Sequence, residues 1–492
     1  MYKCFRRKLN KYGEIEMNSE SRGKYLFKNT FIFTIGSIGT KLITFFLVPL
    51  YTYMLTSKEY GVVDLISTIS MVLVPVLVLN INESVMRFSL DKDANYNQIM
   101  SAGLLSLFLA VVVGILIFPI SGMISGIQQY AGYLYFYTIS SAASQLFLCY
   151  LRGKEKLMHY ACGNILNTFC VAILNIIFLV VLKAGIQGYL KAYIIANFIT
   201  ALYAFAVGNV KEVLKHFQLN RKLTFEMLKY SVVLIPNVFM WWIMNSADRI
   251  VVTMFLGAAA NGIFAIAYKI PSLMSTVAGI FNQAWSYSAI REDNSDDIEK
   301  YTNSVYRGLF FVVSGCALGM MMVLKPFLSI YVSDEYFIAW KYAPFLIIGF
   351  VFQTLSTFLS TPYTVNKDSK GFLFSAMTGA IANIVLNILL VFKLGIYGVA
   401  FATCVSYIVV FLYRMVDTKK YVRVYVFDKK YLLVFGILFL QTMIIYLNNL
   451  VSQIVLVVLF LIGVIVQYKV WLPVWRQITS RLIKKIEGLR KC

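Results

Sequence analysis

Residues 236–270 read PNVFMWWIMNSADRIVVTMFLGAAANGIFAIAYKI, two apolar runs joined at a Leu-Gly step. Extended outward, each run is long enough to cross the hydrocarbon core of a bilayer, which takes about 20 residues of helix. The stretch nevertheless carries Asp248, Arg249 and Lys269. A charge at the bilayer centre costs on the order of 2.5–3.5 kcal/mol on insertion scales, so each of these residues needs a structural or functional reason.

The rest of the chain repeats this pattern. Hydrophobic residues make up 59% of the sequence and charged residues 14%, proportions outside the range of soluble domains. We therefore predict an all-α polytopic membrane protein of about 14 transmembrane helices, with spans near 27–54, 61–82, 99–120, 130–150, 159–182, 187–208, 229–255, 262–286, 308–325, 338–361, 371–392, 396–413, 431–447 and 451–472. The last two runs are read as a hairpin at Asn448-Asn449, because one helix through both would be about 63 Å long.

The basic residues predict the orientation. Of 45 Lys and Arg residues, 36 fall on one side of the membrane when the loops are assigned to alternating sides. The opposite side has five, namely Lys58, Lys183, Lys325, Lys341 and Lys393, and the spans hold Lys41, Lys191, Arg249 and Lys269. The positive-inside rule places both termini in the cytoplasm. The net charge of +22 is spread over short loops, so anionic phospholipids are the expected neighbours and nucleic acid is not.

An internal repeat divides the predicted helices into two lobes. Residues 55–61 (LTSKEYG) and 256–262 (LGAAANG) each join two spans, and Gly-Ile-x-Gly segments recur at 185–188 and 395–398, with offsets of 201 and 210 residues. Two copies of six helices insert with the same orientation, so an axis along the membrane normal relates them. The predicted domains are a basic cytoplasmic tail (1–24), an N-lobe of helices 1–6 (25–208), a cytoplasmic linker (209–228), a C-lobe of helices 7–12 (229–417), helices 13 and 14 (430–472) and a basic amphipathic cytoplasmic tail (473–492).

Proline and charge gather in corresponding helices of the two copies. Spans 1, 2, 7 and 8 hold the prolines Pro49, Pro75, Pro236 and Pro271 and the charged residues Lys41, Asp64, Asp248, Arg249 and Lys269. Paired helix interruptions in two halves of a membrane protein point to a transport path. Two interpretations stay open. The charges either neutralise each other as Asp248–Lys269 or Asp64–Lys41 pairs, or line a net-cationic cavity between the lobes that suits an anionic substrate.

Other charged residues favour a structural interpretation. Lys191, near the outer end of its span, can extend its ammonium to the interface. Glu83, Arg87 and Arg152 lie where spans reach the cytoplasm. Asp91-Lys-Asp93 has the DxD form of sugar-nucleotide enzymes, but it lies in a short loop with no domain around it and is read as chance.

Several enzyme classes are disfavoured. There is no Walker-type phosphate loop, and the only histidines are His159 and His216. The seven cysteines are odd in number and show no metal-ligand spacing, so neither a disulfide framework nor a metal site is expected. The connections on the outer side are short and leave no room for a catalytic domain. We expect no enzyme activity and no cofactor.

The stretch 236–270 resembles the Wzx-type polysaccharide-biosynthesis flippases of the multidrug/oligosaccharidyl-lipid/polysaccharide exporter superfamily. The resemblance rests on Pro236-Asn237, Asp248-Arg249, Leu256-Gly257 and Ala267-Tyr-Lys269-Ile270, together with the two Leu-Asn…Gly-Ile-x-Gly segments, and it covers about residues 25–472. It implies two six-helix lobes in a V, alternating access, and a bacterial cytoplasmic membrane location.

The resemblance also implies the cargo, an undecaprenyl-diphosphate-linked oligosaccharide for a capsule, exopolysaccharide, O-unit or teichoic-type polymer. Lys41, Arg249 and Lys269 are the substrate-binding candidates, and Asp248 and Asp64 the ion-coupling candidates. Peptidoglycan-precursor flippases tend to carry several arginines in the first two spans, where this chain has Lys41 alone. The alternatives are a cation-coupled multidrug exporter of the same superfamily and a membrane glycosyltransferase or polymerase. The expected partners are the lipid-linked cargo, anionic phospholipids and the polymerase and glycosyltransferases of the same pathway, with the chain itself a monomer.

Overall fold

A computed structural model describes residues 39–91, 93–121, 128–291, 297–426, 428–447 and 449–468. Within these ranges the regular secondary structure is helical throughout. Eleven of the described helices are long and apolar enough to cross a membrane. The predicted all-α polytopic fold is therefore confirmed. The predicted tails 1–24 and 473–492 lie outside the described residues.

The long helices occur in the order of the predicted spans. The first half contains residues 39–54, α3 (Ser57–Leu77), α5 (Tyr96–Ser121), α6 (Ala131–Gly153), α7 (Leu157–Asn175) and α8 (Gly185–Val207). The second half contains α10 (Arg221–Leu256), α11 (Ala258–Arg291), α12 (Ile298–Tyr331), α14 (Ala343–Leu359), α16 (Ser369–Leu394), α17 (Ile396–Asp417), α18 (Lys429–Ile444) and residues 450–468. Shorter helices are α4 (Ile81–Ser89), α9 (Val210–Lys215), α13 (Asp334–Phe337) and α15 (Thr361–Val365).

One predicted span is interrupted. The sequence predicted a continuous helix over 61–82, but α3 ends at Leu77 and α4 begins at Ile81. Between them Leu79 and Asn80 have φ angles of 51° and 52°, in the left-handed region that breaks a helix. Pro75 lies in the last turn of α3, where its ring removes a backbone donor, and its carbonyl accepts from the Asn80 N–H at 2.7 Å.

Side-chain caps fix where several helices begin. Thr56 forms a capping box with Glu59, because its hydroxyl accepts from the Glu59 N–H at 3.3 Å and the carboxylate accepts from the Thr56 N–H at 3.0 Å. Asn220 accepts from two backbone N–H groups at the start of α10. Asp368 accepts from the Gly371 N–H at the start of α16, and this bond is the main cause of the lowered pKa of that carboxyl. These polar residues mark helix starts in the sequence.

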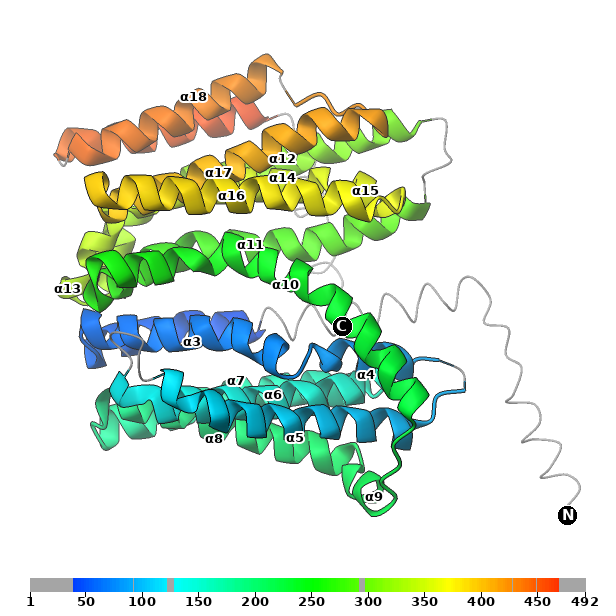
Figure 1. Ribbon diagram of the computed structural model, residues 1–492. Coiled ribbons are helices and arrows are strands. Elements are labelled where there is room, and N and C mark those ends of the chain that lie inside the picture. Colours follow the sequence, from blue (N-terminus) through cyan, green and yellow to red (C-terminus); the bar gives the residue numbers. More distant parts are fainter. Residues whose placement is uncertain are drawn as a thin grey trace, which may run out of the picture.

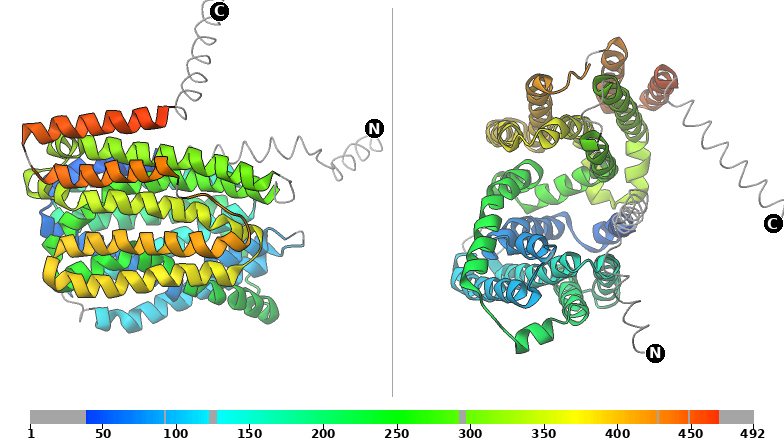
Figure 2. Two further views of the ribbon diagram at one scale, coloured as in Figure 1. Left: turned by 90° about the horizontal axis from the view of Figure 1, so that it is seen from above. Right: turned by 90° about the vertical axis from the view of Figure 1, so that its right-hand side faces the viewer.

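The helices pack in two groups that follow chain order (Figure 1). In the first group, drawn blue to cyan-green, α6 packs against α3, α5, α7 and α8. In the second, drawn green to red, α14 packs against α11, α12 and α17, and α16 packs against α17. We call these the N-terminal and C-terminal helix groups. Figure 2 shows the long helices running roughly parallel, with the orange and red helices at the edge of the C-terminal group.

Helix α10 connects the groups. It packs against α3 and α4 of the first group and against α16 and α17 of the second (Figure 1). Ser84 of α4 donates to the Met227 carbonyl at 2.6 Å, and the Trp242 indole donates to the Thr68 carbonyl at 2.8 Å. The predicted linker 209–228 thus overlaps a helix that holds both groups, and the predicted lobe boundaries stay predictions.

The glycines at the repeated Leu…Gly turns make a reciprocal contact between the groups. A Cβ placed on Gly61 would lie 1.8 Å from the Ala258 carbonyl oxygen, and one on Gly262 would lie 2.0 Å from the Ser57 carbonyl oxygen. The offset of 201 residues that relates Gly61 to Gly262 also relates Ser57 to Ala258. Each half therefore gives the other the same contact, as a two-fold axis requires. This packing supports the predicted internal repeat.

Adding a methyl group at either position should disrupt this contact. Gly61→Ala or Gly262→Ala is expected to lower stability by about 1–3 kcal/mol, the usual effect of overpacking. Gly279→Ala on the same helix as Gly262 is the control, because nothing lies within 4 Å of its Cβ position. Thermal unfolding of the purified variants measures the difference. Equal midpoints for all three variants would contradict the close contact.

The sidedness predicted from the basic loops can be tested by labelling. Successive loops lie at opposite ends of the bundle, with α13 at one end and α9 and α15 at the other (Figure 1). In a cysteine-free background, single cysteines at Gln129 and Leu450 are expected to react with an impermeant thiol reagent on intact cells. Cysteines at Asn220 and Arg423 are expected to react only after lysis. Labelling of position 220 on intact cells would reverse the orientation.

Candidate substrate site between the helix groups

An ion pair joins α10 to α3 of the N-terminal helix group. The Arg249 Nε of α10 lies 2.8 Å from the Asp64 Oδ2 of α3, and both side chains are mostly buried. The guanidinium also donates to the Asn245 carbonyl at 3.1 Å and lies 4.8 Å from the ring centre of Tyr268. Asn261 of α11 donates to the same Asp64 oxygen at 3.4 Å. Asp64 therefore compensates the charge of Arg249 across the interface.

Two lysines contribute positive charge beside this pair. Lys269 of α11 is partly buried and lies in the wall of a cavity that also contains Asp64. The Lys269 ammonium interacts electrostatically with Asp64, Lys41 and Arg249. Lys41, in helix 39–54, is exposed. Within the described ranges, neither lysine ammonium takes part in an ion pair. Lys41, Asp64, Arg249 and Lys269 together carry a net positive charge, because Asp64 neutralises Arg249 and neither lysine is in an ion pair.

Asp248 faces the other way. It is 1% exposed and lies inside the C-terminal helix group, between α10, α16 and α17. Its carboxylate accepts from the Asn387 amide at 2.5 Å and from the Thr403 hydroxyl at 2.6 Å. Asn383, one turn before Asn387, accepts from the same Asn387 amide at 3.1 Å. Successive helical residues point about 100° apart, which is why Asp248 and Arg249 have separate environments.

The two predicted pairings are therefore wrong. Asp248 is paired with neutral amide and hydroxyl donors and not with Lys269. Asp64 is paired with Arg249 and not with Lys41. Of the five predicted residues, the structure brings Lys41, Asp64, Arg249 and Lys269 together and places Asp248 in a separate polar cluster. The pairing could not be read from the sequence because it depends on how α10 rotates against α3.

Arg87, Arg152 and Lys191 lie at the surface. Arg87 forms an exposed ion pair with Asp91 at 2.6 Å, and Lys191 and Arg152 are exposed. This agrees with their structural interpretation. The Arg87–Asp91 pair also uses one carboxylate of the DxD triplet within its own helix turn. Among the described residues no cluster of three or more His, Cys, Asp or Glu side chains is arranged to hold a metal.

A polar cavity opens from the charged site into the N-terminal helix group. Its volume is about 240 Å³. We call it the N-terminal cavity, and its wall consists of residues from α3, α6, α8 and α11: Tyr60, Asp64, Ser67, Ser70, Met71, Tyr137, Ser141, Gln145, Tyr189, Tyr193 and Lys269. Only Asp64 and Lys269 carry charge. This cavity could not be predicted from the sequence, because single Tyr, Ser and Gln residues are common in membrane helices.

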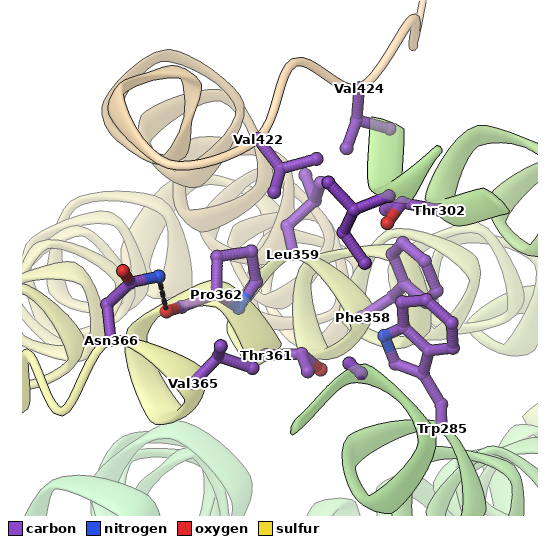
Figure 3. A pocket seen from close by; sticks show the side chains of 12 residues that line it. Trp285, Thr302, Phe358, Leu359, Thr361, Pro362, Val365, Asn366, Val422 and Val424 are labelled. Carbon is purple, nitrogen blue, oxygen red and sulfur yellow. Dashed lines mark hydrogen bonds between the residues drawn. The ribbon is translucent and has the colours of Figure 1, made fainter. Parts of the chain in front are cut away.

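A second hollow, in the C-terminal helix group, is apolar (Figure 3). Its volume is about 20 Å³, and Trp285, Phe358, Pro362 and Val424 are among its lining residues. The Trp285 ring stacks on Phe358 with ring centres 4.9 Å apart. The Asn366 amide donates to the Pro362 carbonyl at the margin of the hollow, as the dashed line in Figure 3 shows. The lining residues that the structure describes are uncharged, and the hollow is as small as a packing defect between helices.

The Arg249–Asp64 pair can be tested by a double-mutant cycle. Arg249→Gln leaves the Asp64 carboxylate mostly buried and unpaired, and breaking a buried pair in this way costs about 3–5 kcal/mol. The double variant Asp64→Asn with Arg249→Gln is expected to recover most of that loss, because both charges are gone. Thermal unfolding of the two single variants and the double variant gives the coupling. Additive effects would contradict a direct interaction.

The architecture defines a class of protein. A bundle of membrane helices in two groups related by an internal repeat is an arrangement known among transporters. Solved structures share this fold. The chain superposes on "Lipid II flippase MurJ, inward closed conformation" with a TM-score of 0.63 and 13% identity, covering 92% of this chain and 100% of that one. It superposes on an inward-facing multidrug resistance MATE family transporter of the MOP superfamily with a TM-score of 0.62 and 15% identity, covering 79% and 98%.

Sequence comparison gives the family. Residues 26–287 match the family described as "Polysaccharide biosynthesis protein". This match spans more than half of the chain, which therefore belongs to that family and is a multi-pass protein of the bacterial cell membrane. A curated relative, "Probable lipid II flippase MurJ" of Thermotoga maritima, is 25% identical over 189 residues. That alignment covers 36% of this chain and 38% of the relative, so the chain matches well under half of the relative's length.

Proposed function

We propose that this protein moves an undecaprenyl-diphosphate-linked oligosaccharide from the inner to the outer leaflet of the membrane by alternating access. The observation that carries the proposal is the pair of lysines, Lys41 and Lys269, that have no ion-pair partner in the described residues, with Lys269 in the wall of the cavity that also contains Asp64, the partner of Arg249. Cations without an ion-pair partner favour an anionic group, and a diphosphate offers several acceptor oxygens to them. Membership of the polysaccharide biosynthesis family supports the same substrate class.

Arg249 has two roles in this proposal. In the present conformation Asp64 neutralises it and holds the two helix groups together. A diphosphate entering beside Lys269 competes with Asp64 for the guanidinium, so cargo binding weakens the contact between the groups. Arg249→Lys keeps the charge but loses the planar two-donor geometry. Its activity therefore separates a simple charge requirement, which leaves partial transport, from a bidentate phosphate contact, which leaves none.

In this proposal the energy for transport comes from the membrane potential, from an ion gradient or from removal of the cargo, and not from a reaction that the protein catalyses. Each elementary charge that crosses the full membrane potential is worth about 2.3 kcal/mol per 100 mV. A cargo with two diphosphate charges that moves outward through an inside-negative potential gains roughly twice that. An ion bound at Asp248, or removal of the cargo by a downstream polymerase, adds to this driving force. The glycosyltransferases and polymerase of the pathway are the proposed partners of a monomeric flippase.

The same fold also occurs in multidrug exporters, which makes a cation-coupled drug exporter the competing candidate. The charge of the site argues against it. An organic cation would meet Lys41 and Lys269, while the carboxylate nearby is already paired with Arg249. Drug resistance that depends on this gene, with normal surface polysaccharide after its deletion, would favour the exporter.

Deletion of the gene in its own host tests the proposal. The deletion strain is expected to lose the surface polymer and to accumulate the complete lipid-linked oligosaccharide on the cytoplasmic side. Plasmid-borne wild type should restore export, and a plasmid carrying Lys41→Gln with Lys269→Gln should not. Loss of the lipid-linked oligosaccharide itself would indicate a biosynthetic role instead, and would contradict a flippase.

A further inference from the structure

The N-terminal cavity has an uncharged inner wall next to a charged mouth. Tyr137, Ser141 and Gln145 of α6 and Tyr193 of α8 form part of the wall, and Lys269 and Asp64 carry its only charges. The volume of about 240 Å³ is roughly twenty times what a single water needs. The cavity is thus large enough for a small polar ligand and is continuous with the group of cations proposed to bind the diphosphate.

The wall residues have unused hydrogen-bonding capacity. Within the described part of the chain, the Tyr137 hydroxyl makes no hydrogen bond, although its ring packs against that of Tyr193 with centres 5.9 Å apart. The Gln145 amide donates to the Ser141 hydroxyl at 3.0 Å, which leaves the exposed Gln145 carbonyl oxygen available. Tyr193 in turn stacks on Tyr189 at 4.7 Å and is held in place by it. Fixed aromatic faces and free polar groups on one wall suit a ligand with both apolar faces and hydroxyl groups.

We propose that the N-terminal cavity binds the uncharged sugar ring attached directly to the diphosphate, a hexose or an N-acetylhexosamine. A pyranose ring has C–H faces that pack on aromatic rings and hydroxyl groups that exchange hydrogen bonds with Tyr, Ser and Gln side chains. The inner wall carries no cation, so an acidic sugar placed there would be buried without a partner charge. The inference rests on the proposed function, because Lys269 at the mouth positions the phosphate and the sugar bonded to it then lies inside.

The connectivity of the cargo explains why the first sugar is selected. Lys269 lies on the C-terminal helix group, whereas the uncharged wall belongs to the N-terminal group. Lys269 shares the cavity wall with these residues, so a glycosylated carrier lipid makes two contacts, its diphosphate with Lys269 and its sugar with the uncharged wall. A lipid diphosphate that lacks the sugar makes only the first contact. The cavity thereby lets the protein distinguish a glycosylated carrier lipid from an empty one.

Binding to the purified full-length chain in detergent tests this assignment. The probes are undecaprenyl diphosphate carrying one N-acetylhexosamine, and undecaprenyl diphosphate without a sugar. The triple variant Tyr137→Phe, Ser141→Ala, Gln145→Ala should bind the glycosylated probe about ten- to a hundred-fold more weakly, as expected for the loss of several neutral hydrogen bonds. Its affinity for the sugar-free probe should change by less than about two-fold.

Two further variants separate the sugar contact from folding. Tyr137→Phe alone removes one hydroxyl without changing the ring, and it should lose about two- to ten-fold for the glycosylated probe only. Tyr133→Phe, one turn away on α6, removes a hydroxyl that donates to Gln187 outside the cavity wall, and should leave both affinities unchanged. Equal binding of the glycosylated probe by wild type and both cavity variants, or an equal loss for both probes, overturns the sugar site. Wild type that binds neither probe overturns the proposed function itself.

Discussion

Replacing Lys41 and Lys269 together by Gln is expected to abolish export while the protein remains folded in the membrane. The two ammonium groups are not ion-paired within the described residues, so their removal leaves no buried carboxylate without its partner. A hydrogen bond to a charged group contributes about 1.5–3 kcal/mol, so loss of two such contacts weakens diphosphate binding roughly a hundred-fold or more. Surface polymer in a complemented deletion strain measures the effect.

Controls for this variant come from lysines outside the site. Lys191→Gln and Lys393→Gln remove the same charge from exposed positions on α8 and at the end of α16. Both are expected to export normally, which excludes a general effect of net charge on insertion. Full export by the Lys41, Lys269 double variant would contradict the cationic site and would assign these lysines to lipid headgroup contacts.

The second large effect concerns Asp248. Its carboxylate is 1% exposed and accepts hydrogen bonds from Asn387 and Thr403, with no Lys or Arg paired to it among the described residues. We propose that this carboxylate takes up a proton or a small cation, because a buried carboxylate without a charged partner is unfavourable. Asp248→Asn keeps the shape and removes this capacity. We expect the variant to fold and to lose the response of transport to an imposed proton or sodium gradient.

Reconstituted vesicles measure this response, with potential, pH gradient and sodium gradient imposed separately. The wild-type initial rate should rise with one of the ion gradients, and the Asp248→Asn rate should not. Asp64→Asn is the comparison, because Asp64 is paired with Arg249 and is the weaker candidate for ion coupling. If no gradient changes the wild-type rate and Asp248→Asn transports normally, the ion-coupling proposal is wrong and the chain is a passive, cargo-driven flippase.

The membrane helices could be predicted from sequence because hydropathy depends only on local composition. Each predicted span corresponds to a helix wherever the structure describes it. The interruption at Leu79 and Asn80 could not be located, because Pro75 indicates a weakened helix but not the residue that takes a left-handed conformation. Helix lengths were underestimated too. Helix α10 has 36 residues, since its first turns are polar and extend past the predicted span.

The sequence predicted which charged residues form the site but not how they pair. Unfavourable charges inside apolar runs identified Lys41, Asp64, Arg249 and Lys269 without any tertiary information. Their pairing required the packing of α10 on α3, which joins residues far apart in the chain. One sequence feature indicated the polar cluster around Asp248. Asn383 and Asn387 lie one helical turn apart and so share a face of their helix. That these two asparagines contact Asp248 could not be predicted, because it depends on the packing of α10 against α16.

We propose that the cations between the helix groups bind a lipid diphosphate while the protein moves it across the membrane. The most direct measurement reconstitutes purified protein in vesicles with a labelled undecaprenyl-diphosphate oligosaccharide and follows its transfer between leaflets by the access of an impermeant quencher. We expect rapid transfer with wild type and with Lys191→Gln, and transfer at the protein-free rate with the Lys41, Lys269 double variant. Equal transfer by wild type and the double variant, or none above protein-free vesicles with wild type, would contradict it.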